Sequence, residues 1–315
     1  SGGTSLVTPA MKSLPVGIPK LMISTLASGS VGQYVGPTDI MMMNSVIDIQ
    51  GLNQISEQIL ANGANAIAGM VKNIKKTKEN RLLESVKPAI GLTMYDVTKP
   101  AIEKITSELN NRYDCLVFHA IGNSGQSMEK LVNSGILNAV IDLTTTEISD
   151  MMMGGVFAEN EDRFSSFIRN KIPYVGSVGA LDMVKFGSRD SVPESYSKRK
   201  FVEFNPTVTL MRTSVEENTR MGKWIAERIN KMTGPVRFLI PEAGVSSLDQ
   251  KGQAFFDPEA DRALFDAISQ QFQESANHRL IHTPYHINDD DFIRAIIDSL
   301  DEINPEQMKY QYATA

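Results

Sequence analysis

After residue 87, apolar segments of strand length alternate with segments of helical periodicity. The predicted strands are 88–95, 113–122, 138–144, 172–181, 236–242 and 279–287. The predicted helices are 99–111, 125–135, 145–155, 215–232, 257–272 and 289–303. Strands that are apolar throughout are buried on both faces, which requires helices on both sides of a parallel sheet. The alternation predicts a doubly wound α/β domain over residues 81–303, followed by a tail at 304–315.

The first 80 residues contain too little strand for a complete sheet. They have one clear strand over 18–28, an apolar run after Asp39 and a long amphipathic segment over 49–76 that predicts a helix. The polar stretch 77–86 is expected to be a linker. We therefore expect residues 1–80 to form the C-terminal part of a second α/β domain, which is incomplete in this chain.

The predicted helix at 49–76 carries an apolar stripe and small residues between Gly63 and Gly69. An incomplete domain cannot bury such a stripe by itself. We expect a homodimer, with this helix or the methionine run at 41–43 near the interface.

Composition excludes several classes of protein. The net charge of −6 argues against nucleic-acid binding, and the basic cluster at 72–78 is explained by the end of a helix. No apolar run suits a membrane span or a signal peptide. Cys115 is the only cysteine, so a disulfide within the chain is excluded and the cytoplasm is the expected compartment.

Ligands of doubly wound sheets bind beyond the carboxyl ends of the strands, and two glycine-rich stretches are candidates there. In the first, Gly2 and Gly3 would let a phosphate approach the backbone, and the hydroxyls of Thr4 and Ser5 would donate to it. No phosphate-loop lysine is present, and an ordinary glycine turn is the alternative.

The second glycine-rich stretch follows the strand at 113–122. Gly122, Asn123 and Gly125 open the next helix, where a phosphate or carboxylate would fit. His119 near the strand end would face this cleft or, alternatively, be a hydrogen-bonded core residue.

Asp142, Thr144, Thr145 and Glu147 follow another strand. An acid and hydroxyls at a strand end suit Mg²⁺ or a ligand hydroxyl, whereas a Thr shortly before Glu147 also suits a helix cap. Both interpretations stay open, and metal ligands are not assigned.

Arg212 would clamp a carboxylate or phosphate, and Glu242 ends the strand at 236–242. We expect Asp142, Arg212 and the Gly122–Gly125 turn to share one open side of the sheet. No Gly-x-Ser-x-Gly elbow is present, and the spacing assembles no serine-hydrolase triad.

Several longer segments are more specific together than any one motif. They are SGGTSLVTPAMKSLPVGIPKLMISTLASG, YVGPTDIMMMNSVIDIQGLN, LVFHAIGNSGQSMEKL, VIDLTTTEI, NPTVTLMRT and GVSSLDQKGQAFFDPEAD. They resemble the uncharacterised protein family typified by the ATP-binding N-terminal region of the tomato mosaic virus resistance protein. The resemblance extends from residue 1 to about residue 303. One departure is Phe204, since the family usually has His before the Asn-Pro at 205–206.

The resemblance implies two Rossmann-like domains, with ATP bound by the first. It implies that roughly a hundred family residues precede this segment, about the size of a missing half-domain. Gly2, Gly3, Thr4 and Ser5 match the glycine-rich loop of the family, with Ser24 and Thr25 beside it at the next strand end. We expect an ATP-binding protein of regulatory or protein-binding type, with Mg²⁺ as a companion of ATP. The alternative is an ATP-dependent enzyme acting on a small carboxylate or phosphate metabolite in the interdomain cleft.

Overall fold

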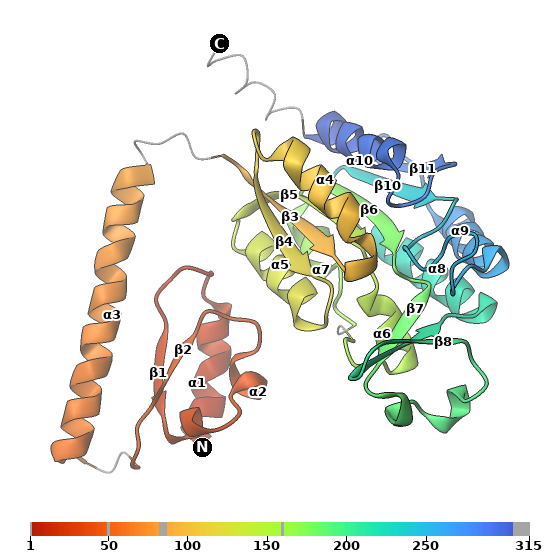
Figure 1. Cartoon of the computed structure of the whole chain (residues 1–315). Helices are drawn as coiled ribbons and strands as arrows, with labels where there is room; N and C mark the ends of the chain where they lie inside the picture. Colours follow the sequence, from red (N-terminus) through yellow and green to blue (C-terminus); the bar gives the residue numbers. More distant parts are fainter. Residues whose placement is uncertain (1, 49–50, 82–86, 159–160, 305–315) are drawn as a thin grey trace. The chain divides into compact units, whose positions relative to one another are not determined.

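The computed structural model describes residues 2–48, 51–81, 87–158 and 161–304. The chain divides into two compact units, Ser1–Lys87 and Pro88–Ala315 (Figure 1). The boundary between the two units falls at residue 87, whereas the sequence predicted it at residue 80. Beyond Asn304, the expected tail lies outside the described residues.

The first unit combines helices with a two-stranded parallel sheet. Its elements are α1 (Gly2–Ser13), β1 (Leu21–Ser24), η1 (Thr25–Ser28), α2 (Gly32–Val35), β2 (Met41–Asn44) and α3 (Gln54–Arg81). Ser24 at the end of β1 lies opposite Asn44 at the end of β2. The sheet is held against the preceding loop by buried Lys20, whose Nζ lies 2.7 Å from Asp39 Oδ1.

Two predictions for the first unit need correction. The glycine-rich stretch at residues 2–5 is the first turn of α1 and not a loop. The long helix starts at Gln54 because the Asn53 side chain accepts hydrogen bonds from the backbone N–H groups of Ile55 and Ser56, which caps it. The helix also continues to Arg81, through much of the expected linker.

The second unit is built on a six-stranded parallel sheet with the order β11-β10-β6-β5-β3-β4. The strands are β3 (Ala89–Met94), β4 (Asp114–His119), β5 (Leu137–Thr144), β6 (Tyr174–Gly179), β10 (Val236–Pro241) and β11 (His278–Thr283). All six lie where the sequence predicts strands. The first strand, β3, lies inside the sheet, so the strand order reverses between β3 and β5.

Helices cover both faces of this sheet, as expected for a doubly wound α/β fold (Figure 1). One face packs on α4 (Lys99–Leu109) and α10 (Asp290–Ile303). The other packs on α5 (Asn123–Asn133), α7 (Ser165–Asn170), α8 (Val215–Ile229) and α9 (Pro258–Gln271). Local signals set the helix starts: Ser214 and Glu217 form a capping box on α8, and Asp257 with Pro258 opens α9.

A small antiparallel sheet was not predicted. It has the order β7-β9-β8 and is formed by β7 (Met183–Phe186), β8 (Phe201–Asn205) and β9 (Val208–Arg212). These strands have only four or five residues each, and charged residues interrupt their apolar pattern. Met183 and Leu210 pack on Tyr95, Val97 and Ala180, which follow strands β3 and β6. This sheet therefore covers part of the carboxyl edge of the parallel sheet.

Within the described residues, no helix has both the length and the apolar character needed to cross a membrane.

Candidate functional site

Asp142 lies in β5 and is completely buried. Its two carboxylate oxygens lie 2.8 and 2.7 Å from Nη2 of Arg163. They also accept hydrogen bonds from the hydroxyls of Thr93 and Tyr174, at 2.8 and 3.0 Å. With four such contacts from the protein itself, Asp142 is a structural ion-pair partner and not an open ligand group.

Arg163, the partner of Asp142, was missed by the sequence analysis because it precedes the short helix α7 in a stretch without clear periodicity. Burial alone would lower the pKa of its guanidinium, but the charges of Asp142, Glu147 and Glu129 raise it. Glu129 also accepts hydrogen bonds from the backbone N–H groups of Phe164 and Ser166, at 2.6 and 3.0 Å. The ion pair thus fixes the start of α7 on α5 and β5.

The threonines at the end of β5 and directly after it are buried as well. They form neither the expected open ligand site nor the expected helix cap. Thr144 shares a 2.8 Å hydrogen bond with Thr98, and the Thr145 hydroxyl donates to the Ser177 carbonyl. Thr146 precedes α6 (Glu147–Met153) without a side-chain cap bond, and its hydroxyl donates to the Ala180 carbonyl at 2.6 Å. These hydroxyls tie adjacent strand ends together, and Glu147 is buried beside them.

Arg212 belongs to a second buried cluster. Its Nη2 lies 2.6 Å from Asp261 Oδ1 and 3.6 Å from Asp249 Oδ1, and its Nε donates to the Phe255 carbonyl. The expectation that Asp142 and Arg212 line one open cleft is therefore wrong, because each is buried among its own partners. Arg212 connects β9 of the antiparallel sheet to α9.

Three buried carboxylates surround Arg212: Asp182, Asp249 and Asp261. Burial and the charge of Asp249 raise the pKa of Asp182 to about 7, despite the opposing effect of Arg212. Burial likewise raises the pKa of Asp261. One guanidinium cannot balance three carboxylates in a buried place, so the cluster favours retention of a proton near neutral pH.

The turn that begins α5 is also partly covered. Gly122 has a φ of 51° and donates its N–H to the Phe157 carbonyl, and a Cβ at this position would lie 3.5 Å from the Ala158 carbonyl. Gly125 is buried in the first turn of α5. His119 is half-buried, 3.5 Å from Asp96, with its ring centroid 5.4 Å from that of Tyr95. Backbone carbonyls of residues 157–158 thus occupy the side where an anion was expected.

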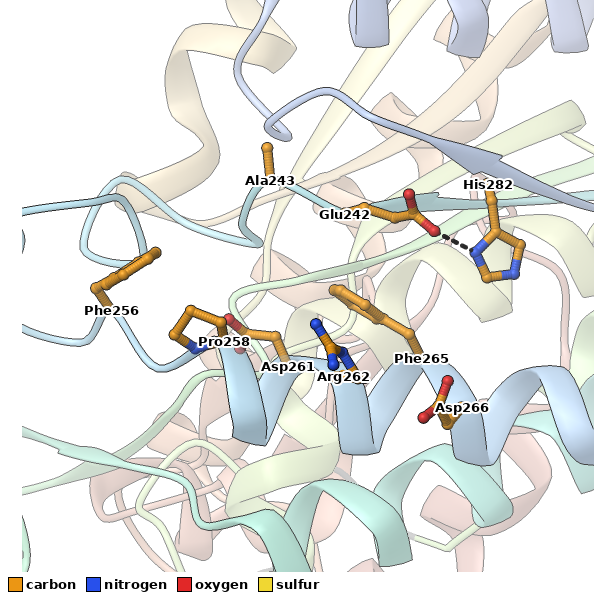
Figure 2. Close-up of a pocket in the computed structure, with 9 residues that line it drawn as sticks. All are labelled: Glu242, Ala243, Phe256, Pro258, Asp261, Arg262, Phe265, Asp266 and His282. Carbon is orange, nitrogen blue, oxygen red and sulfur yellow. Dashed lines mark hydrogen bonds and ion pairs between the residues drawn. The ribbon is translucent and has the colours of Figure 1, made fainter.

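Glu242 is the predicted strand-end residue that does line a pocket. The pocket has a volume of about 480 Å³ and lies between the carboxyl ends of β10 and β11 and the N-terminal half of α9 (Figure 2). Figure 2 shows the Glu242 carboxylate directed toward the His282 ring, and Arg262 and Asp266 standing on the helix below them. The Arg262, Asp266 and His282 positions were not predicted, because sequence alone does not show which face of α9 meets the strand ends.

Glu242, His282 and Ser269 form a hydrogen-bonded row beside the pocket. Glu242 Oε1 lies 2.9 Å from His282 Nδ1, and His282 Nε2 lies 3.0 Å from Ser269 Oγ. The contacts follow the order of a hydrolase triad, but Ser269 Oγ also donates to the Phe265 carbonyl at 2.7 Å. Ser269 lies near the C-terminal end of α9, where backbone carbonyls oppose a developing negative charge. These hydrogen bonds orient the His282 ring, but they do not activate Ser269 as a nucleophile.

In the first unit, the nucleotide candidates divide between α1 and the end of β1. Gly2, Gly3, Thr4 and Ser5 form the first turn of α1, whereas Ser24 ends β1 and Thr25 begins η1. The buried Thr4 hydroxyl lies 2.7 Å from the Ser24 hydroxyl. The structure therefore brings the start of a helix next to the carboxyl end of a parallel strand, the usual anion-binding arrangement in this fold class.

The fold defines a mixed α/β protein of the Rossmann-like class. Residues 1–76 match the N-terminal domain, and residues 87–304 the C-terminal domain, of the uncharacterised protein family UPF0261. The chain belongs to this family. Both family domains are thus matched within this one chain.

Relatives occur in bacteria and in tomato. A UPF0261 protein of Mesorhizobium japonicum is 52% identical over 300 residues, covering 95% of this chain and 74% of the relative. A UPF0261 protein of Rhizobium meliloti is 51% identical over 307 residues, covering 96% and 75%. The ToMV resistance protein Tm-1(GCR237) of Solanum lycopersicum is 43% identical over 307 residues, covering 97% of this chain and 41% of that protein.

The carboxylate cluster generates a prediction about stability and pH. Because the folded-state pKa of Asp182 is about 7 and its ordinary value is 3.8, the folded protein binds more protons than the unfolded protein between these values. The free energy of unfolding should therefore fall as pH rises from 4 to 7, by up to about 1.4 kcal/mol per pH unit for one group. Urea unfolding of Asp182→Asn at pH 5, 6, 7 and 8 should show a flatter dependence than the wild type.

Asp291→Asn, at an exposed position in the first turn of α10, is the matched control for loss of one carboxylate. If the free energy of unfolding of Asp182→Asn fell with pH as steeply as that of the wild type, the assignment of the bound proton to Asp182 would be wrong.

Proposed function

We propose that this protein binds ATP, with Mg²⁺ as the companion of the phosphates, and acts as a regulatory or protein-binding module of the cytoplasm. The observation that carries the proposal is the first turn of α1. Its backbone N–H groups begin at a glycine pair, and the Thr4–Ser24 hydrogen bond holds this turn at the end of β1.

Gly3 supports this proposal through its surroundings. A Cβ at Gly3 would meet no atom within 4 Å, so packing among the described residues does not require glycine there. A glycine in the first turn of a helix leaves the backbone N–H groups uncovered by a side chain, so a phosphate can approach them closely.

Two observations favour a binding protein over the enzyme alternative. The acids and threonines at 142–147, and Arg212, motivated the enzyme hypothesis, but all of them are buried, and Asp142 and Arg212 form ion pairs within the protein. The name of the tomato relative refers to virus resistance and to no reaction. Both observations agree with a protein partner whose binding depends on whether the nucleotide is bound.

We also propose a homodimer formed through α3. Leu52 and Ile55, just before and at the start of this helix, are 73% and 50% exposed. Gly63 already packs against β1 of the same chain, since a Cβ there would lie 2.6 Å from Ile23 Cδ1. Light scattering at micromolar concentration should give a dimer for the wild type and a monomer for Ile55→Glu. A wild-type monomer, or a variant that stays dimeric, would refute this interface.

The substitution Gly3→Ala tests the nucleotide site. Calorimetric titration with Mg-ATP should show at least about tenfold weaker binding, because the added methyl group occupies the space of the phosphate. Thermal unfolding should show no loss of stability, because a Cβ at Gly3 meets no atom within 4 Å.

Gly69→Ala in α3 is the matched control. A Cβ there also meets no atom within 4 Å, so this variant should keep wild-type affinity for ATP. Absence of ATP binding by the wild type, or unchanged affinity in Gly3→Ala, would overturn the proposal.

A further inference from the structure

The pocket between α9 and the ends of β10 and β11 belongs wholly to the second unit, whereas the proposed nucleotide site belongs to the first. Its volume of about 480 Å³ falls in the range of pockets for small molecules. Its walls combine aromatic surface with charged groups, and the state of each charge indicates what kind of ligand fits.

Two of the charged groups already form ion pairs with neighbouring side chains. Asp261 lines the pocket and holds Arg212 at 2.6 Å, so it is not free to bind a ligand charge. Glu242 pairs with His282 at 2.9 Å, but it remains about half exposed at the strand end. These contacts leave Glu242 able to accept one more hydrogen bond from a ligand, because a carboxylate has several lone pairs.

Arg262 and Asp266 are different. Both side chains are exposed, and they lie one turn apart on α9. Within the described part of the chain, neither side chain makes a hydrogen bond or an ion pair. Figure 2 shows both side chains on the α9 side of the pocket, with the Phe265 ring above Arg262. The same wall therefore offers one unpaired positive charge and one unpaired negative charge.

We propose that this pocket binds a small zwitterion of the α-amino-acid type. The ligand carboxylate pairs with the Arg262 guanidinium, whose fork matches carboxylate geometry. The ligand ammonium lies between Asp266 and the free lone pairs of Glu242. An apolar ligand side chain packs on Phe256, which is 38% exposed, and on Phe265.

Ligands with a single charge fit this pocket less well. A simple anion would meet the carboxylates of Glu242 and Asp266, and a simple cation would meet Arg262. Among the described residues, no three acidic, cysteine or histidine side chains are grouped so as to hold a metal ion. Only a ligand that carries both charges satisfies Arg262 and Asp266 together.

The test uses the full chain and sets of three matched probes, with binding followed by saturation-transfer NMR and calorimetry. One set is leucine, 4-methylpentanoate and isopentylamine, and the other is phenylalanine, 3-phenylpropanoate and phenethylamine. At least one amino acid should bind at least about tenfold more tightly than both of its single-charge analogues, which corresponds to about 1.4 kcal/mol. No binding by either amino acid, or equal binding by an analogue, overturns the proposal.

Variants locate the site. Arg262→Gln and Asp266→Asn should each weaken amino-acid binding at least about tenfold while leaving the melting temperature unchanged, since both positions are exposed and unpaired. Arg294→Gln on α10 and Glu259→Gln on α9 are matched controls at exposed positions outside the pocket, and should bind as the wild type does. Wild-type affinity in both Arg262→Gln and Asp266→Asn overturns the proposal. ATP titration of the same variants should be unchanged, so failure of this site is distinguishable from failure of the nucleotide site.

Discussion

The buried ion pair between Asp142 and Arg163 is the constraint on which the centre of the second unit depends. Both side chains are fully buried, and a charge in such a place is tolerated only when it is paired and hydrogen-bonded. Arg163 therefore brings the start of α7 against β5, and Glu129 of α5 caps that helix. The remaining bonds to Asp142, from Thr93 and Tyr174, join β3, β5 and β6.

The strand ends near Asp142 are covered in part by the protein itself. In doubly wound sheets the usual site lies where the strand order reverses, which is between β3 and β5 here. In this chain the threonine hydroxyls join the neighbouring strand ends, and the antiparallel sheet packs over the residues that follow β3 and β6. Arg212 then ties that sheet to α9. The pocket lined by Glu242 lies at the ends of β10 and β11, near one edge of the sheet.

The sequence predicted the parallel sheet well because its six strands are long apolar runs separated by helices with clear caps. It did not predict β7, β8 and β9, whose short segments carry Lys185, Glu203 and Arg212 among apolar residues. For the site, Glu242 was found from its strand end, but Asp142 and Arg212 were taken for ligand groups. A polar residue after a strand looks the same in sequence whether it faces solvent or a buried partner, and Arg163, the partner of Asp142, is distant and lacks a motif.

The central claim is that Asp142 is structural, and a double-mutant cycle of unfolding free energies measures this most directly. Asp142→Asn and Arg163→Met should each lose about 3–5 kcal/mol, because each leaves the other charge buried and unpaired. The double variant should lose clearly less than the sum of the two, by at least about 1 kcal/mol. Losses below about 1 kcal/mol in the single variants, adding without coupling in the double variant, would contradict the account.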